Sequence, residues 1–169
     1  MSKVSDEIKI KIYNASKVLQ KKAGTGKVSA AKIKEAEKII EDNTVNFVPI
    51  ALDYLKDLNA AMETARKQKG EEKDRLHNIT LPIMHLKSTG TVFKYPLVSE
   101  LSDITLTFLE TAKKLDEDVL AIVDAHRNLV QAILAAEMKS SGGAKGKAMK
   151  AEMTSVCDRY MKKHNISRK

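Results

Sequence analysis

The chain has 169 residues, of which 43% are hydrophobic, and its net charge is +8. This length suits one domain with a sizeable core, while the single cysteine, Cys157, excludes an internal disulfide framework and leaves a structural zinc site short of ligands. The sequence has neither an apolar run near the ~20 residues of a membrane span nor the apolar core of a signal peptide, which predicts a soluble, cytoplasmic protein without a membrane partner.

The positive charge raises the question of nucleic-acid binding, because clustered Lys and Arg release counterions from a phosphate backbone. The basic residues concentrate in residues 19–34, 140–150 and 161–169, and acidic residues are interspersed elsewhere. Aromatic residues make up only 4% of the chain, so no platform for base stacking is evident. We therefore expect the lysines to lie on solvated helix faces and chain ends, and we do not expect nucleic acid as a partner.

Two helices are predicted in the N-terminal part of the chain. In residues 4–24, apolar residues recur at three- and four-residue steps, which places them on one helix face. Residues 29–43 form the second predicted helix, with Ser29 as its N-cap. The residues expected to face inward from this helix are Ile33, Ala36 and Ile40.

The remaining predicted helices are longer and more strongly amphipathic. Their ranges are 46–70, 71–91, 96–114, 117–140 and 147–163. The apolar stripe of the first comprises Phe47, Ile50, Leu52, Leu55, Leu58 and Met62. Because four of these helices follow one another through short turns and each stripe must be covered, they predict an all-α protein built on an antiparallel four-helix bundle. We expect an N-terminal helical extension (residues 1–45), the bundle (46–141), and a flexible Gly/Lys-rich linker with a C-terminal helix (142–169).

The run HLKSTGTVFKYPLVSEL, residues 85–101, is similar to a known motif. It resembles the core of bacterial histidine-containing phosphotransfer domains, in which a phosphoacceptor His, a spacer, Leu-Lys-Gly, small residues and a Phe-Gly-Tyr-Pro-Leu turn follow in order. The matching residues are Leu86, Lys87, Gly90, Phe93, Tyr95, Pro96, Leu97 and Val98. The resemblance extends over about residues 46–140 and implies a four-helix bundle of a two-component phosphorelay, which passes a phosphoryl group between a histidine and the aspartate of a receiver domain.

The chain departs from this motif at the phosphoacceptor. When the motif is aligned on Leu86 and Lys87, the phosphoacceptor position is Met84, whose thioether cannot hold a transferable phosphoryl group. His85 stands one residue away, which is about 100° around a helix, and Ser88 replaces the glycine of the family. Three interpretations are open: a helical bulge just after His85 makes it the phosphoacceptor, the domain docks its partners but has lost the chemistry, or both residues are ordinary members of an inherited scaffold.

The resemblance also implies roles for individual residues. His85 is the candidate phosphoacceptor, and Lys87 would stabilise phosphoryl charge. The residues implied to contact a docked partner are Met84, Ser88, Thr89, Gly90, Phe93 and Tyr95. The implied partners are a response-regulator receiver domain and a histidine kinase. No cofactor is expected on this chain, because the magnesium ion belongs to the receiver, and the protein is expected to be a phosphoryl carrier or docking protein rather than an enzyme.

The other histidines do not suggest a site. His77 and His85 are eight residues apart, not the four that would place two metal ligands on adjacent turns. We expect His126 to be partly buried and hydrogen-bonded in its helix, and His164 to be exposed. The alternative function is a helical adaptor or structural protein that binds anionic partners through its basic ends, and a steep loss of affinity with salt would distinguish it.

Overall fold

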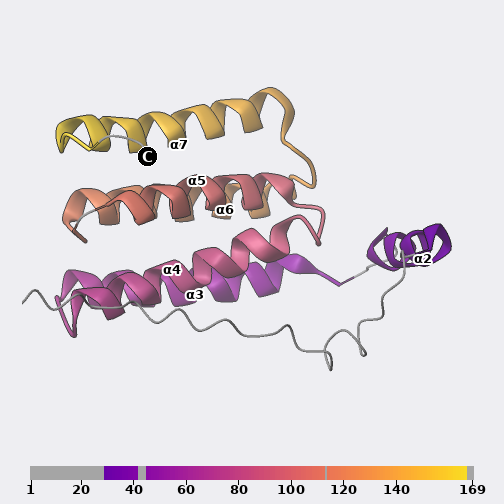
Figure 1. The fold of residues 1–169 in the computed structure, drawn as a ribbon, viewed down its shortest axis with the longest axis horizontal. Coiled ribbons are helices and arrows are strands. Elements are labelled where there is room, and N and C mark those ends of the chain that lie inside the picture. Colours follow the sequence, from indigo (N-terminus) through magenta and orange to yellow (C-terminus); the bar gives the residue numbers. More distant parts are fainter. Residues whose placement is uncertain (1–28, 42–44, 113, 167–169) are drawn as a thin grey trace, which may run out of the picture. The chain divides into compact units, whose positions relative to one another are not determined.

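The computed structural model describes residues 29–41, 45–112 and 114–166, and every regular element within them is a helix. The helices are α2 (Ala30–Glu41), α3 (Phe47–Arg66), α4 (Glu72–Gly90), α5 (Pro96–Thr111), α6 (Glu117–Ala135) and α7 (Gly143–Lys163) (Figure 1). The predicted all-α class is confirmed. The helix predicted for residues 4–24 lies outside the described residues. Because the chain divides into two compact units between residues 42 and 43, α2 is described separately from the rest.

Helix α2 begins where the sequence predicts. The Ser29 Oγ accepts a hydrogen bond from the backbone N of Lys32 at 3.3 Å, which is the expected N-cap interaction. However, Ile33 is 47% exposed and Ala36 is also exposed, so the prediction that they face inward is wrong. The physical reason is that α2 is the one helix described in its unit, and an apolar stripe is buried only where a second element of the unit covers it.

Helices α3 to α7 lie side by side and share one hydrophobic core (Figure 1). Helix α3 packs on α4, α4 on α5, α5 on α6, and α6 again on α3, while α7 packs against α5 and α6. Each of the three connections from α3 to α6 is short, spanning residues 67–71, 91–95 and 112–116, so that successive helices run antiparallel. The largest buried side chains include Phe47, Leu58, Met62, Ile79, Ile83, Leu86, Leu101 and Ile133.

The apolar stripe predicted for α3 is largely confirmed. Its buried members are Phe47, Leu55, Leu58 and Met62, and Ile50 is half-buried. Leu52 is the exception, with 45% of its surface exposed. Ala51 takes the core position between Phe47 and Leu55 instead, because it lies four residues from each of them and therefore on the same side of the helix.

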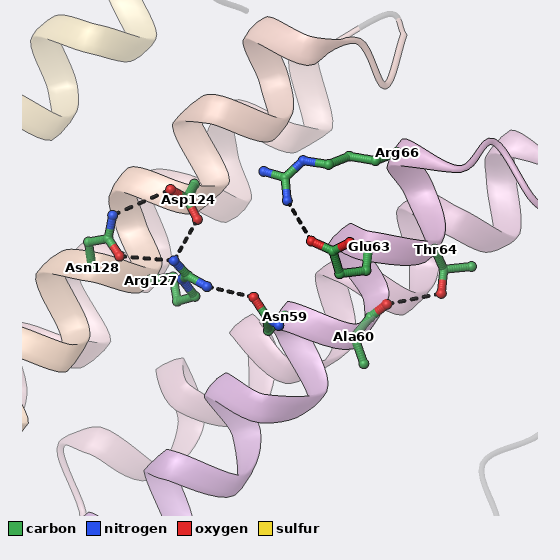
Figure 2. A network of polar contacts seen from close by, with 8 residues as sticks. All are labelled: Asn59, Ala60, Glu63, Thr64, Arg66, Asp124, Arg127 and Asn128. Carbon is green, nitrogen blue, oxygen red and sulfur yellow. Dashed lines mark hydrogen bonds and ion pairs between the residues drawn. The ribbon is translucent and has the colours of Figure 1, made fainter.

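A polar network holds α3 against α6 (Figure 2). The Arg127 Nη1 of α6 donates a hydrogen bond to the Oδ1 of Asn59 on α3 at 2.5 Å. The Nη2 of the same guanidinium lies 2.9 Å from the Asp124 Oδ1 and donates to the Oδ1 of Asn128 at 3.2 Å. Two neighbours on α6 therefore hold the Arg127 guanidinium, which joins α6 to Asn59 on α3.

A serine of α5 closes the end of α4. The Ser99 Oγ donates a hydrogen bond to the backbone O of Lys87 at 2.8 Å and accepts one from the backbone N of Thr91 at 2.9 Å. The last carbonyls of a helix have no partner within the helix, so this side chain satisfies one of them from the neighbouring element. The interaction ties the C-terminal end of α4, which carries the motif, to the first turn of α5.

Helix α7 begins earlier than predicted. It starts at Gly143, within the segment that was expected to be a flexible linker. Gly142 takes a left-handed conformation with φ of +72° at the N-cap, and Gly146 is buried so closely that a Cβ there would lie 1.9 Å from the Ser141 O. The glycines of this segment are therefore required by a tight turn and close packing, and a flexible linker is the wrong interpretation for residues 143–146. None of the described helices is both long and apolar enough to cross a membrane.

Candidate functional site

Helix α4 buries one face and exposes another. Ile79, Ile83 and Leu86 are completely buried, whereas the opposite face exposes a ridge that includes Leu81 and Met84, with 41% and 53% of their surfaces exposed. The backbone remains α-helical from Glu72 to Gly90 and passes through Pro82 without a bulge. The bulge that would make His85 the phosphoacceptor is therefore absent from this helix.

A groove of about 510 Å³ lies between the exposed side of α4 and α5. Its lining residues are Leu76, Thr80, Met84, Lys87 and Ser88 on α4, and Asp103, Leu106, Thr107, Leu109 and Glu110 on α5. Most of its surface is apolar. Met84 stands midway along the α4 side, and it is exposed at the groove.

Lys87 lies one turn beyond Met84 and faces an acidic partner of its own chain. Its Nζ forms an ion pair of 2.5 Å with the Asp103 Oδ1 on α5, and 48% and 57% of the two side chains are exposed. The sequence singled out Lys87 but not Asp103, because an ion pair that joins two helices leaves no periodic signal in the sequence. The Lys87 ammonium group is thus paired with a carboxylate at the edge of the groove.

His85 points to a different neighbour. Its exposed imidazole stacks on the ring of Tyr54 of α3, with a centroid distance of 5.1 Å and an angle of 17° between the planes. It is not among the residues that line the groove. The structure therefore brings Met84, Lys87 and Ser88 together in the groove and places His85 on the side of α4 that faces α3.

The small residues at the end of α4 make local contacts. The Ser88 Oγ and the Thr89 Oγ1 both donate hydrogen bonds to the backbone O of His85, at 3.0 and 2.6 Å. Gly90 is buried, and a Cβ there would lie 2.6 Å from the Ser99 Oγ. Its lack of a side chain allows α4 and α5 to approach each other, whereas the contact of Gly90 with a docked partner stays a prediction. Ser88 is exposed in the groove and Thr89 is half-buried.

The aromatic residues of the turn after α4 pack against the start of α3. The rings of Phe93 and Tyr95 lie 5.2 and 5.3 Å from the ring of Phe47 at the start of α3. Tyr95 is only 2% exposed, and burial, with a smaller contribution from the Glu137 charge, raises the pKa of its hydroxyl. Tyr95 therefore packs the turn against the core, and Phe93 is half-buried against the same core. The contact of these two residues with a docked partner stays a prediction.

His126 is more unusual than the sequence indicates. It is completely buried on α6, and within the described residues neither ring nitrogen has a hydrogen-bond partner. His126 is therefore buried more completely than expected, and the expected hydrogen bond is not formed with any described residue. Burial lowers the pKa of its imidazole to about 4, which keeps it neutral at physiological pH. It belongs to the core and not to the groove.

Nowhere in the described ranges, 29–41, 45–112 and 114–166, do three or more His, Cys, Asp or Glu side chains group as metal ligands would. The chain was compared with protein-family models, with curated proteins and with solved structures, and none of the three comparisons found a match.

Proposed function

We propose that the chain is a degenerate phosphotransfer protein, in which α3 to α6 form a four-helix bundle of the phosphotransfer type. It docks the receiver domain of a response regulator through the groove between α4 and α5 without accepting the phosphoryl group. One observation carries the proposal: Met84, and not His85, lies in the groove beside Lys87 and Ser88. The thioether stands where the motif needs an imidazole.

The composition of the groove supports docking. Met84 is flexible and polarisable, and such a side chain adapts to the apolar surface of a partner. The apolar lining supplies area that loses water on contact, whereas the pairing of Lys87 with Asp103 leaves little free charge for a phosphoryl group. The net charge of +8 favours encounter with an acidic surface such as that of a receiver.

The stacking of His85 argues against an active relay. To attack an acyl phosphate held over the groove, the imidazole would have to leave Tyr54 and pass around α4. Since α4 has no bulge that would turn it, docking without transfer is the function that we favour. In such a role the protein would occupy receivers, or the histidine kinases that phosphorylate them, and thereby regulate the phosphorelay.

Phosphotransfer assays test the chemistry. Phosphorylated receiver domains of the same organism are incubated with the wild type, with Met84→His and with His85→Gln, and acid-labile label is located by mass mapping. We expect no label on the wild type or on His85→Gln, and label on residue 84 of Met84→His. Label on the wild type that is lost in His85→Gln would show instead an active relay with a displaced acceptor.

Binding measurements test the surface. Receiver affinity is compared for the wild type, for Met84→Lys in the groove and for Leu52→Lys, a matched exposed apolar position on α3 outside the groove. We expect Met84→Lys to weaken binding strongly and Leu52→Lys to leave it nearly unchanged. Equal effects of the two variants, or a steep loss of wild-type affinity with salt, would favour the adaptor that binds through basic ends.

A further inference from the structure

Met84 differs from the other described methionines in its exposure. Of its surface 53% is exposed, compared with 0% for Met62, 1% for Met153 and 6% for Met161. The remaining two in the described part of the chain, Met138 and Met149, are half-buried against the core. Oxidation of a methionine by peroxide follows its exposure, and Met84 is the most exposed of the described methionines, so we expect it to be the preferred target among them.

Met84 lies among apolar side chains, so a more polar side chain at this position would change how the groove binds a partner. The groove presents Leu76, Leu106 and Leu109 around it, and a sulfoxide oxygen in this place would have to lose its water when an apolar partner docks. On the same face of α4, Lys87 is paired with Asp103, and the Ser88 Oγ donates its hydrogen bond to the His85 backbone O. An oxidised Met84 would therefore bring a hydrogen-bond acceptor into a mostly apolar groove, where docking of an apolar partner removes the water that it binds.

We propose that Met84 is a site of reversible oxidation and that its oxidation closes the groove to apolar partners. A peroxide transfers one oxygen atom to the Sδ: the O–O bond breaks, an S–O bond forms, the sulfur is oxidised by two electrons, and water or an alcohol leaves. A thiol-dependent sulfoxide reductase reverses the change: two thiols are oxidised to a disulfide, the sulfur is reduced by two electrons, and the oxygen leaves as water. The inference that Met84 is oxidised rests on its exposure alone. The inference that oxidation weakens the binding of a receiver rests on the proposed function.

The first experiment measures the site. The full chain is treated with limiting hydrogen peroxide, digested, and mapped by mass spectrometry for the addition of one oxygen atom to each methionine. We expect Met84 to be oxidised several-fold faster than Met138 and Met149, and Met62 and Met153 to be slower still. If Met84 reacts no faster than the half-buried methionines, the inference is wrong, whatever the receiver assays give.

The second experiment measures the consequence with the apolar dye bis-ANS and with a receiver domain. The samples are the reduced and the oxidised wild type, Met84→Leu, which stays apolar and resists oxidation, and Met84→Gln, which is polar. Leu52→Gln is the control for an exposed apolar residue elsewhere. Circular dichroism confirms that each variant is folded.

We expect the oxidised wild type and Met84→Gln to bind the dye several-fold more weakly than the reduced wild type, and Met84→Leu to be insensitive to peroxide. Dye binding that is equal in the reduced and oxidised proteins, or absent from both, would overturn the closing of the groove. If the dye responds as expected but no receiver binds the reduced protein, oxidation of Met84 does close the groove, and the proposed function is wrong.

Discussion

Met84 and His85 are neighbours in the chain but belong to different surfaces of α4. Met84 lines the groove toward α5, whereas His85 stacks on Tyr54 of α3 at a centroid distance of 5.1 Å. A rotation of about 100° per residue separates the two directions in any regular α-helix. The residue at position 84 therefore decides the chemical character of the groove. That residue is a methionine, and the neighbouring histidine contributes to another surface.

The contact between His85 and Tyr54 predicts an energetic coupling between α4 and α3. In a double-mutant cycle with His85→Ala and Tyr54→Ala, we expect a coupling of about 0.5–1.5 kcal/mol, which is typical of an aromatic pair. The free energy of unfolding of the wild type, both single variants and the double variant, measured with urea, gives this quantity. The pair Leu52→Ala and His85→Ala is the control, and a coupling as large there would mean that the stacking is not its source.

His126 predicts a loss of stability in acid. Its pKa is lowered to about 4 in the folded protein, so the unfolded chain, with an ordinary value near 6.5, binds the proton more readily between these pH values. The free energy of unfolding should therefore fall by about 3 kcal/mol as the pH is lowered from about 6.5 to about 4. Urea titrations at several pH values measure this slope of the free energy of unfolding against pH.

The variant His126→Leu should remove most of this dependence, because no buried imidazole then takes up a proton on unfolding. The exposed His77 supplies the control, since His77→Gln should keep the slope of the wild type. A slope in His126→Leu as steep as that of the wild type would assign the acid sensitivity to other groups.

The close approach of α5 to Gly90 predicts that any side chain at this position would clash with α5. In Gly90→Ala the new Cβ would lie 2.6 Å from the Ser99 Oγ and 3.0 Å from the backbone O of Tyr95, which should cost about 1–3 kcal/mol of stability. Combination with Ser99→Ala removes the closest of these atoms. We therefore expect the double variant to be less destabilised than the sum of the two single variants, as measured by thermal or urea unfolding, and strict additivity would contradict the clash.

The ion pair of Lys87 and Asp103 should matter for binding rather than for folding. Both side chains are about half exposed, and exposed pairs contribute no more than about 1 kcal/mol to stability. If a receiver docks in the groove, Asp103→Asn should raise the association rate by freeing the ammonium group, and Lys87→Gln should lower it, both most strongly at low salt. Stopped-flow kinetics across a salt series measure these rates. Unchanged rates in both variants would place the receiver elsewhere.

The sequence by itself determined the helices from α3 to α7 and the angular separation of Met84 from His85, because both follow from the local period of the α-helix. Only the tertiary structure decided that Gly90 and Tyr95 are buried, that Lys87 meets Asp103, and that His126 lies in the core with no hydrogen-bond partner among the residues that the structure describes. These facts depend on which faces of different helices meet. A local pattern shows which side of a helix is apolar, but the contacts between helices are set by the packing of side chains that are distant in the chain.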